Sequence, residues 1–175
     1  MKNKHRKFAL ITALVMSVSM AMTACGDDDS KDDDDEDETP KYEQPVESYL
    51  KAIQNGSGSD FKKSIGKEQA AYIEENLSDD YFDTYAKELR EDAEDQYGEN
   101  LKITYKVKDK EKIDKEDLED YESEYESKYD ADVTISEGYE LETTVKLKGK
   151  DDSDEDDMTF TVVKIDSKWV IYDIK

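Results

Sequence analysis

The segment GYELETTVKLKG, residues 138–149, constrains the fold of this chain more than any other segment. Tyrosine, leucine, threonine, valine and leucine occupy alternate positions, and charged residues or threonine stand between them. Because successive side chains of an extended strand point to opposite faces, this pattern places one face in a core and the other in solvent. The segment therefore predicts a half-buried strand in a sheet that a second layer covers on one side.

Three further segments have strand character. Residues 101–108, LKITYKVK, alternate in the same way. Residues 158–165, MTFTVVKI, and 168–174, KWVIYDI, are separated only by Asp166 and Ser167, which predicts a hairpin. The acidic residues 150–157, KDDSDEDD, are expected to form a loop before the third strand.

Segments with helical spacing of apolar residues lie before the first strand and between the first and second strands. The first helix is expected after Pro45 and stops at Asn55-Gly56; GSGSD then predicts a flexible turn. A second helix follows Phe61, a third uses Ser78 as its N-cap and stops at Gly98, and a fourth starts at Asp114 between strands. Their expected buried faces are Val46, Tyr49, Leu50 and Ile53; Ala70, Ile73 and Leu77; Phe82, Tyr85, Leu89 and Ala93; and Leu118, Tyr121, Tyr125 and Tyr129.

These elements predict an α+β domain over residues 41–175. Three N-terminal helices pack on a curved antiparallel sheet of about four strands, with one helical insertion. Charged residues make up 42% of the chain, a composition that also occurs in disordered proteins. The strand period of 2 and the helix period of 3.6 are both present, with turn residues between the segments, and this pattern favours a folded domain. The net charge of −23 repels phosphate backbones, so nucleic acid is excluded as a partner.

The N-terminus has the order of a secretory signal. A basic segment, MKNKHRK, precedes fifteen apolar or small residues, fewer than the roughly 20 that span a bilayer. The following MTAC resembles the lipobox of bacterial lipoprotein signals, with Met22 in place of the commoner leucine. The resemblance implies acylation of Cys25 and cleavage between Ala24 and Cys25, which removes residues 1–24. The alternatives are a secreted protein with a free thiol and an uncleaved anchor.

Residues 25–40 are expected to be the lipidated cysteine and an acidic disordered tether. Ten acids and one lysine stand in the twelve residues from Asp27 to Glu38, and charges this dense repel one another. The tether would hold the domain away from the extracytoplasmic face of the cell membrane. A tract that loads calcium or wall cations is the alternative.

Two segments resemble small lipoproteins of Gram-positive bacteria with a nuclear transport factor 2-like (cystatin-like) domain. PVESYLKAIQNGSGSDFKKSI resembles the opening helix of that family, and MTFTVVKIDSKWVIYDI resembles its closing hairpin. The inserted GSGS and Ser167, where glycine is usual, depart from the pattern in loops. The resemblance implies a cone of curved sheet and helices, often with a pocket. Members of the family include enzymes as well as binding and assembly modules.

The chemistry of most enzymes is missing from the mature sequence. His5 is lost with the signal, and Cys25 is the only cysteine. Histidine-based triads and Cys/His metal clusters are therefore excluded. A carboxylate-dependent hydrolase is the remaining enzymatic alternative.

Asp152, Asp154 and Asp156 have the first spacing of a calcium loop, but Asp157 replaces its glycine and Val163 its final glutamate. They are weak candidates for a divalent cation; otherwise no metal or cofactor is expected. The tyrosines at 121, 125 and 129 could stack on sugars or pack on the sheet, and the spacing favours packing.

The sequence as a whole predicts a lipid-anchored, extracytoplasmic, non-catalytic binding or assembly module. The expected partners are the membrane and an envelope or cell-wall protein. A pocket for a small hydrophobic or cationic ligand is the alternative.

Overall fold

The computed structural model describes residues 39–175; the predicted signal segment, Cys25 and the acidic residues up to Glu38 lie outside this range. Within it the chain forms five helices and four strands, and none of these helices is long and apolar enough to cross a bilayer. The helices are α1 (Gln44–Asn55), α2 (Gly58–Ser64), α3 (Lys67–Asn76), α4 (Tyr81–Tyr97) and α5 (Lys115–Tyr129). The strands are β1 (Lys102–Lys112), β2 (Ile135–Lys148), β3 (Ser153–Ile165) and β4 (Lys168–Ile174).

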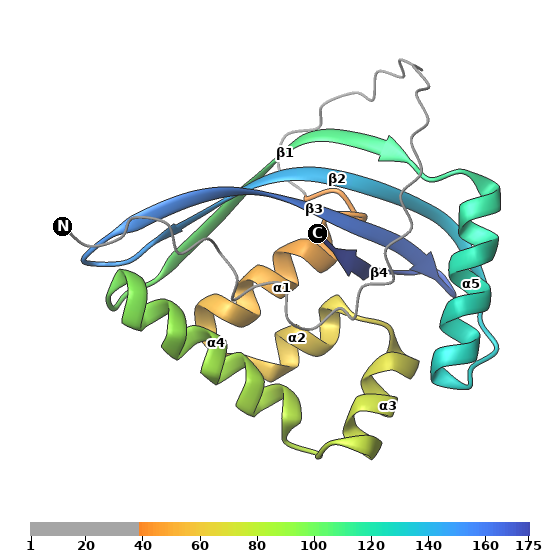
Figure 1. The fold of residues 1–175 in the computed structure, drawn as a ribbon, viewed down its shortest axis with the longest axis horizontal. Coiled ribbons are helices and arrows are strands. Elements are labelled where there is room, and N and C mark those ends of the chain that lie inside the picture. The colour runs from red at the N-terminus through yellow and green to blue at the C-terminus, as the bar shows by residue number, and fades with distance from the viewer. Residues whose placement is uncertain (1–38) are drawn as a thin grey trace.

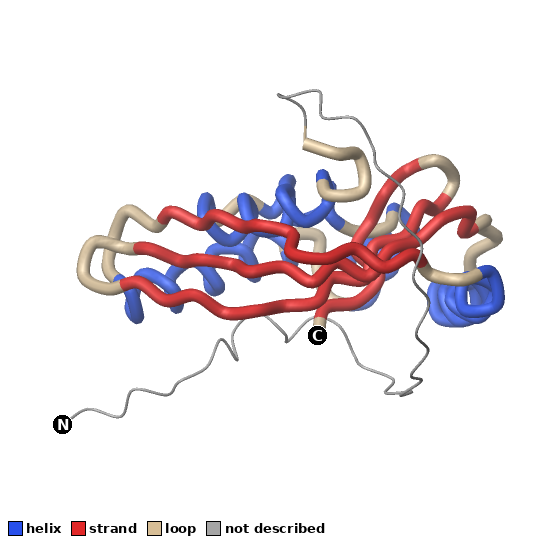
Figure 2. Tube along the Cα trace, turned by 90° about the horizontal axis from the view of Figure 1, so that it is seen from above, coloured by secondary structure: helices blue, strands red, loops and turns tan. Residues whose placement is uncertain are grey.

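The four strands form one antiparallel sheet in the order β1-β2-β3-β4. The sheet is long and curved, and it arches over α1, α2 and α4, which lie on its concave side (Figure 1). Figure 2 shows the helical layer beneath the long strands, with α5 at the end away from the β2–β3 hairpin. The β3–β4 hairpin is confirmed: Asp166 and Ser167 both have positive φ angles, of 45° and 79°, as a type I′ turn requires.

The main core lies between the concave face and these helices. Phe61 of α2, Phe82 of α4, Phe160 of β3 and Leu141 of β2 are at most 1% exposed. Gly58 allows the close approach of α2 to α4, because a Cβ there would lie 2.6 Å from the backbone nitrogen of Asp83. The apolar faces that the alternating strand pattern and the helical spacing predicted thus pack against each other, between the sheet and the helices.

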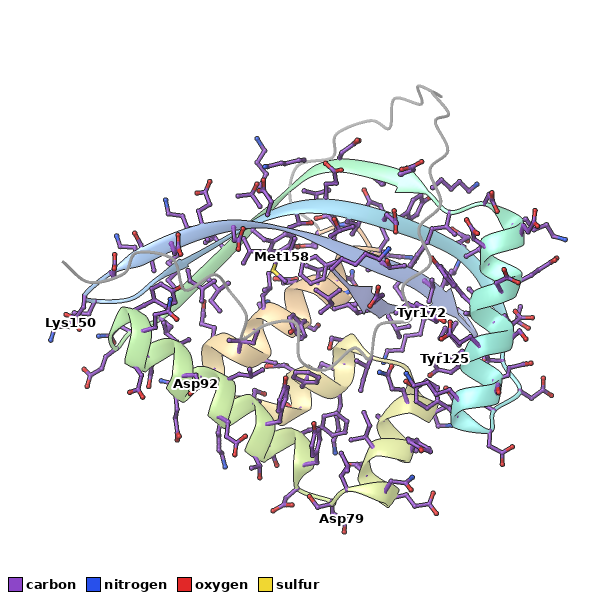
Figure 3. All side chains as sticks on the ribbon, in the orientation of Figure 1. Asp79, Asp92, Tyr125, Lys150, Met158 and Tyr172 are labelled. Atoms are coloured by element: carbon purple, nitrogen blue, oxygen red, sulfur yellow. The ribbon has the colours of Figure 1, made fainter. Side chains whose placement is uncertain are left out.

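A second, smaller core lies on the opposite face of the sheet, under α5. Leu118 and Tyr125 of α5 pack there against Val163 and Val170. Gly138 of β2 makes room for them, since a Cβ would lie 2.9 Å from a Leu118 methyl carbon. Figure 3 shows Tyr125 and Tyr172 beside α5. The packing role predicted for the tyrosine stripe is confirmed: Tyr125 is buried, and Tyr121 and Tyr129 are partly buried against this core.

The α+β class is confirmed, but residues 39–175 contain five helices where four were predicted. The predicted second helix is interrupted at Ile65 and Gly66, whose ψ angles of 170° and 148° are extended. Gly66 lies directly against the Tyr125 hydroxyl of α5, so the chain turns there to let α3 meet α5. The predicted flexible turn at GSGSD is also wrong, because Ser57 caps α2 by accepting from the Asp60 amide at 3.3 Å.

Three other expectations are corrected. Residues 153–157 belong to β3, not to a loop, because they pair with residues 144–148 of β2. Lys146 of β2 and Lys108 of β1 form ion pairs with Glu155 and Asp157 and offset part of their charge. Ser78 does not cap α4; its carbonyl accepts from the Tyr81 amide in a turn, and Asp80 occupies the N-cap position. Leu77 is 61% exposed because it follows the last residue of α3.

Candidate functional site

Eight polar residues form two cross-strand rows on the convex face of the sheet. Strand pairing aligns each row from β1 to the end of the sheet at β4, where Lys175 follows directly after the strand. We call this set the polar grid; its rows are Asp109, Glu142, Thr159 and Lys175, and Glu111, Glu140, Thr161 and Asp173.

Two β-bulges produce the grid. On β1 the register shifts between Val107 and Asp109, so Lys108 is an extra residue and the side-chain phase reverses. Without that shift the convex face would receive Lys110 and Lys112; with it, Asp109 and Glu111 face outward. On β4 the register shift leaves Tyr172 without a partner on β3 and aligns Asp173 with Thr161. Both bulges therefore place carboxylates on the convex side.

The grid is strongly acidic. Five of its members are carboxylates and one, Lys175, is basic. Six members line a shallow depression of about 170 Å³: Asp109, Glu111, Glu140, Glu142, Thr159 and Lys175. The Lys175 ammonium donates to the Glu140 carboxylate at 3.0 Å, and this hydrogen bond raises the pKa of Lys175. One ammonium cannot neutralise five carboxylates, so the surface attracts further positive charge.

One corner of the grid holds two buried polar oxygens that have no hydrogen-bond partner among the described residues. Thr161 is 1% exposed, and its Oγ1 has no hydrogen-bond partner among the described residues. The Oδ1 atom of Asp173, directly opposite on β4, is also buried and lacks a partner there. Tyr121 of α5 stands next to this corner: burial raises its pKa, while the nearby Lys175 charge lowers it and that of Glu140 raises it. Its ring stacks on Tyr172 with centroids 4.5 Å apart.

A second group of interest lies on the concave side. Tyr42, Tyr139 and Trp169 have ring centroids between 5.1 and 6.2 Å apart, and Lys110 sits over both tyrosine rings. All three rings are partly buried against the main core. Their faces are occupied by one another and by Lys110, so the role of this cluster is to pack against the main core.

The carboxyl of Glu43 lies beside this cluster. Burial raises its pKa, whereas the Lys110 charge and a hydrogen bond from Tyr105 lower it. A half-buried acid with a raised pKa is what a carboxylate-dependent hydrolase would need. Glu43, however, faces Tyr105 and Lys110 and lies apart from the acidic rows of the grid.

The Glu43→Gln variant is expected to be more stable than the wild type at neutral pH. Because burial raises the pKa of Glu43 in the folded state, ionisation costs folding free energy as pH rises through that value, and the amide avoids this cost. Urea unfolding at about pH 4 and about pH 7 measures the effect. The gap should be present at the higher pH and nearly absent at the lower; a gap of equal size at both would contradict it.

The structure does not gather the aspartates of the weak cation candidate. Asp152 lies in the β2–β3 turn, while Asp154 and Asp156 follow on β3. Each accepts from the next backbone amide, at 2.8 to 3.0 Å. Alternate side chains of a strand are about 6.6 Å apart, too far to converge on one ion. Within residues 39–175, no group of three or more His, Cys, Asp or Glu side chains is placed to hold a metal ion.

The remaining predicted site residues, Ala24 and Cys25, lie outside the described residues. The polar grid was missed by sequence reasoning. Ile103, Tyr105, Val107 and Ile113 share one parity in the sequence, yet Ile113 packs on the opposite face from the other three. Because Ile113 continues the alternation of the earlier apolar residues, the sequence gives no sign of the bulge at Lys108.

Comparison of this chain with models of protein families, with curated proteins and with solved structures finds no match. Assignment to the nuclear transport factor 2-like lipoproteins stays a prediction. The functional argument therefore depends on the sequence of the N-terminus and on the geometry of the grid.

Proposed function

We propose that this chain is a lipid-anchored, extracytoplasmic binding module without catalytic activity, and that its polar grid receives a cationic group. The single observation that carries the binding role is the grid itself. Five carboxylates and one lysine occupy two aligned rows on the face that α1, α2 and α4 leave uncovered. Such a surface steers positively charged partners toward it.

The anchoring part of the proposal rests on the N-terminal sequence. A basic segment, a short apolar run and MTAC at Cys25 form the signal, and the ten acids after it would separate a strongly acidic domain from the membrane. The exterior location follows from the same signal. We also propose the nuclear transport factor 2-like fold, which the curved antiparallel sheet and the helices beneath its concave face support.

Absence of catalysis is part of the proposal. The sequence after Cys25 contains no histidine and no cysteine. The acid with a burial-raised pKa, Glu43, is engaged by Tyr105. The grid carboxylates are mostly exposed and open to water, which suits the binding of charge better than proton transfer.

The charge of the grid tests the binding role. We expect the double variant Asp109→Asn/Glu142→Gln to weaken binding of a fluorescent lysine-rich peptide to the full chain about fivefold, since each exposed carboxylate contributes about 0.5 kcal/mol. Fluorescence anisotropy at two salt concentrations measures this.

The matched control is Glu91→Gln/Asp92→Asn on α4, which removes the same charge from exposed residues on the other side of the domain. Binding by this control should stay close to wild type. Equal weakening by both pairs would show that the peptide responds to net charge alone and would refute the grid as the site.

A further inference from the structure

We propose that the acidic segment of residues 27–38 docks on a patch of exposed lysines on the convex face of the sheet, at the end next to the β2–β3 hairpin. The inference concerns the chain's own N-terminal segment and goes beyond the binding of cations by the polar grid. We call these five exposed residues the lysine patch: Lys102, Lys106, Lys108, Lys146 and Lys148.

The register of β1 and β2 gathers the patch on one face. Lys102 pairs with Lys148, and Thr104, its neighbour on the same face of β1, pairs with Lys146. Directly paired residues of an antiparallel sheet point to the same side, and Lys106 continues the alternation of β1. The side chains between these positions pack into the main core on the concave side: Ile103, Tyr105, Val145 and Leu147. The lysines therefore share the convex face.

Most of the positive charge of the patch is not neutralised. Lys108 and Lys146 form ion pairs with Asp157 and Glu155, at 2.6 and 3.9 Å. The other three lysines of the patch make no ion pair within residues 39–175. The same residues contain 38 acids and only 20 lysines and arginines, so acids to pair with are abundant in this domain. Three neighbouring lysines without one are free to attract carboxylates from outside it.

The acidic segment joins the described structure close to the patch. Tyr42, three residues after Thr39, has its ring centroid 4.7 Å from the Lys110 Nζ atom of β1. From Lys110 back to Lys102, β1 runs about 27 Å. The twelve residues from 27 to 38 reach on the order of 40 Å when extended. They are long enough to lie along the whole patch.

Charge selects the direction in which the segment runs. Beyond Lys110 lie the grid carboxylates Glu111 and Glu140, which repel the ten acids of the segment. The lysine patch lies the other way. The start of a docked segment therefore lies beside Lys102 and Lys148, at the β2–β3 hairpin. With an anchor at residue 25, this docked state would turn the hairpin toward the membrane and the grid away from it.

Two other occupants fit the patch less well. A second copy would bring another convex sheet, and two convex surfaces touch only over a small area (Figure 1). An external polyanion would meet the repulsion of a domain in which acids far outnumber bases. The chain's own segment meets that repulsion too, but its covalent link holds it at an effective concentration of about millimolar.

The experiment places a nitroxide on residue 30 of the full chain, through Cys25→Ser and Ser30→Cys, so that a single thiol reacts. A nonionic micelle holds the apolar N-terminal run, and the result does not depend on acylation. We expect the nitroxide to broaden the amide NMR signals of Thr104 and Lys146 and to leave those of α3 sharp. In 1 M salt this broadening should disappear, because the Debye length falls to about 3 Å.

The variant Lys106→Gln/Lys148→Gln should lower the ratio of docked to free segment about fivefold, since each exposed ion pair contributes slightly more than a factor of two. The matched control is Lys67→Gln/Lys87→Gln, which removes the same charge from exposed positions on α3 and α4. It should leave the broadening close to that of the unsubstituted patch. Equal loss in both variants would show that the segment responds to net charge alone and would overturn the inference.

Three further results would also overturn it. The first is the absence of broadening at low salt. The second is broadening in a mixed sample whose nitroxide and isotope label are on different molecules, which would assign the patch to a second copy. The third is a shift of the patch signals on addition of phosphatidylglycerol without any broadening by the segment, which would assign the patch to the membrane surface. The peptide-binding test of Asp109 and Glu142 is separate, so the proposed function stands or fails independently.

Discussion

Replacing Cys25 with serine is expected to release nearly all of the protein from the membrane fraction. Serine has no thiol to accept the diacylglycerol, and the lipoprotein signal is then not processed at that position. Stable anchoring needs two acyl chains, each contributing about 0.8 kcal/mol per buried CH₂, so the loss should be close to complete. Incorporation of radiolabelled palmitate and fractionation of cells measure it.

The control for this prediction is Thr23→Ser, which keeps a residue that the lipobox tolerates. It should retain label and membrane location. The domain should fold alike in all three proteins, since both substitutions lie before the helices and strands of residues 39–175. Equal labelling of wild type and Cys25→Ser would refute the lipid anchor and leave the acidic segment without its proposed role as a spacer.

Replacing Phe61 with alanine is expected to reduce the free energy of unfolding by about 3–5 kcal/mol. Phe61 is fully buried, and its ring meets those of Tyr49, Phe82 and Tyr85 at centroid distances of 5.4 to 5.8 Å. These rings come from α1 and α4, so alanine would open a cavity where three helices join. Urea unfolding followed by circular dichroism measures the loss.

Leu77→Ala is the matched control, because it also shortens an apolar side chain but at a position that is 61% exposed. Its cost should stay within about 0.5 kcal/mol. A Phe61→Ala variant with comparable stability to this control would mean that α2 does not pack into the main core.

Local patterns predicted most of the fold because they depend on neighbours in sequence. The first helix includes Pro45 in its first turn and ends before Gly56, which takes a left-handed φ of 62°, and α5 starts directly after Asp114, as expected. Asp114 also caps α5 by accepting from the Asp117 amide at 3.0 Å. Predictions failed where a segment distant in sequence determines the local structure. Gly66 breaks a helix because Tyr125, far along the chain, needs the space, and Ser153–Asp157 become strand because β2 offers them a partner.

The same distinction, between local and distant determinants, separates the predicted membrane location of this protein from its candidate site. The sequence alone predicted the signal and the acylation of Cys25, and it determined the α+β class and the lack of histidine and cysteine after Cys25, because each of these depends on residue identity or on local period. The polar grid depends on register. Only pairing in the folded sheet places the bulges at Lys108 and Tyr172, and a shift of one residue sends every following side chain to the other face. The tertiary structure therefore decided which charges this protein presents to a partner.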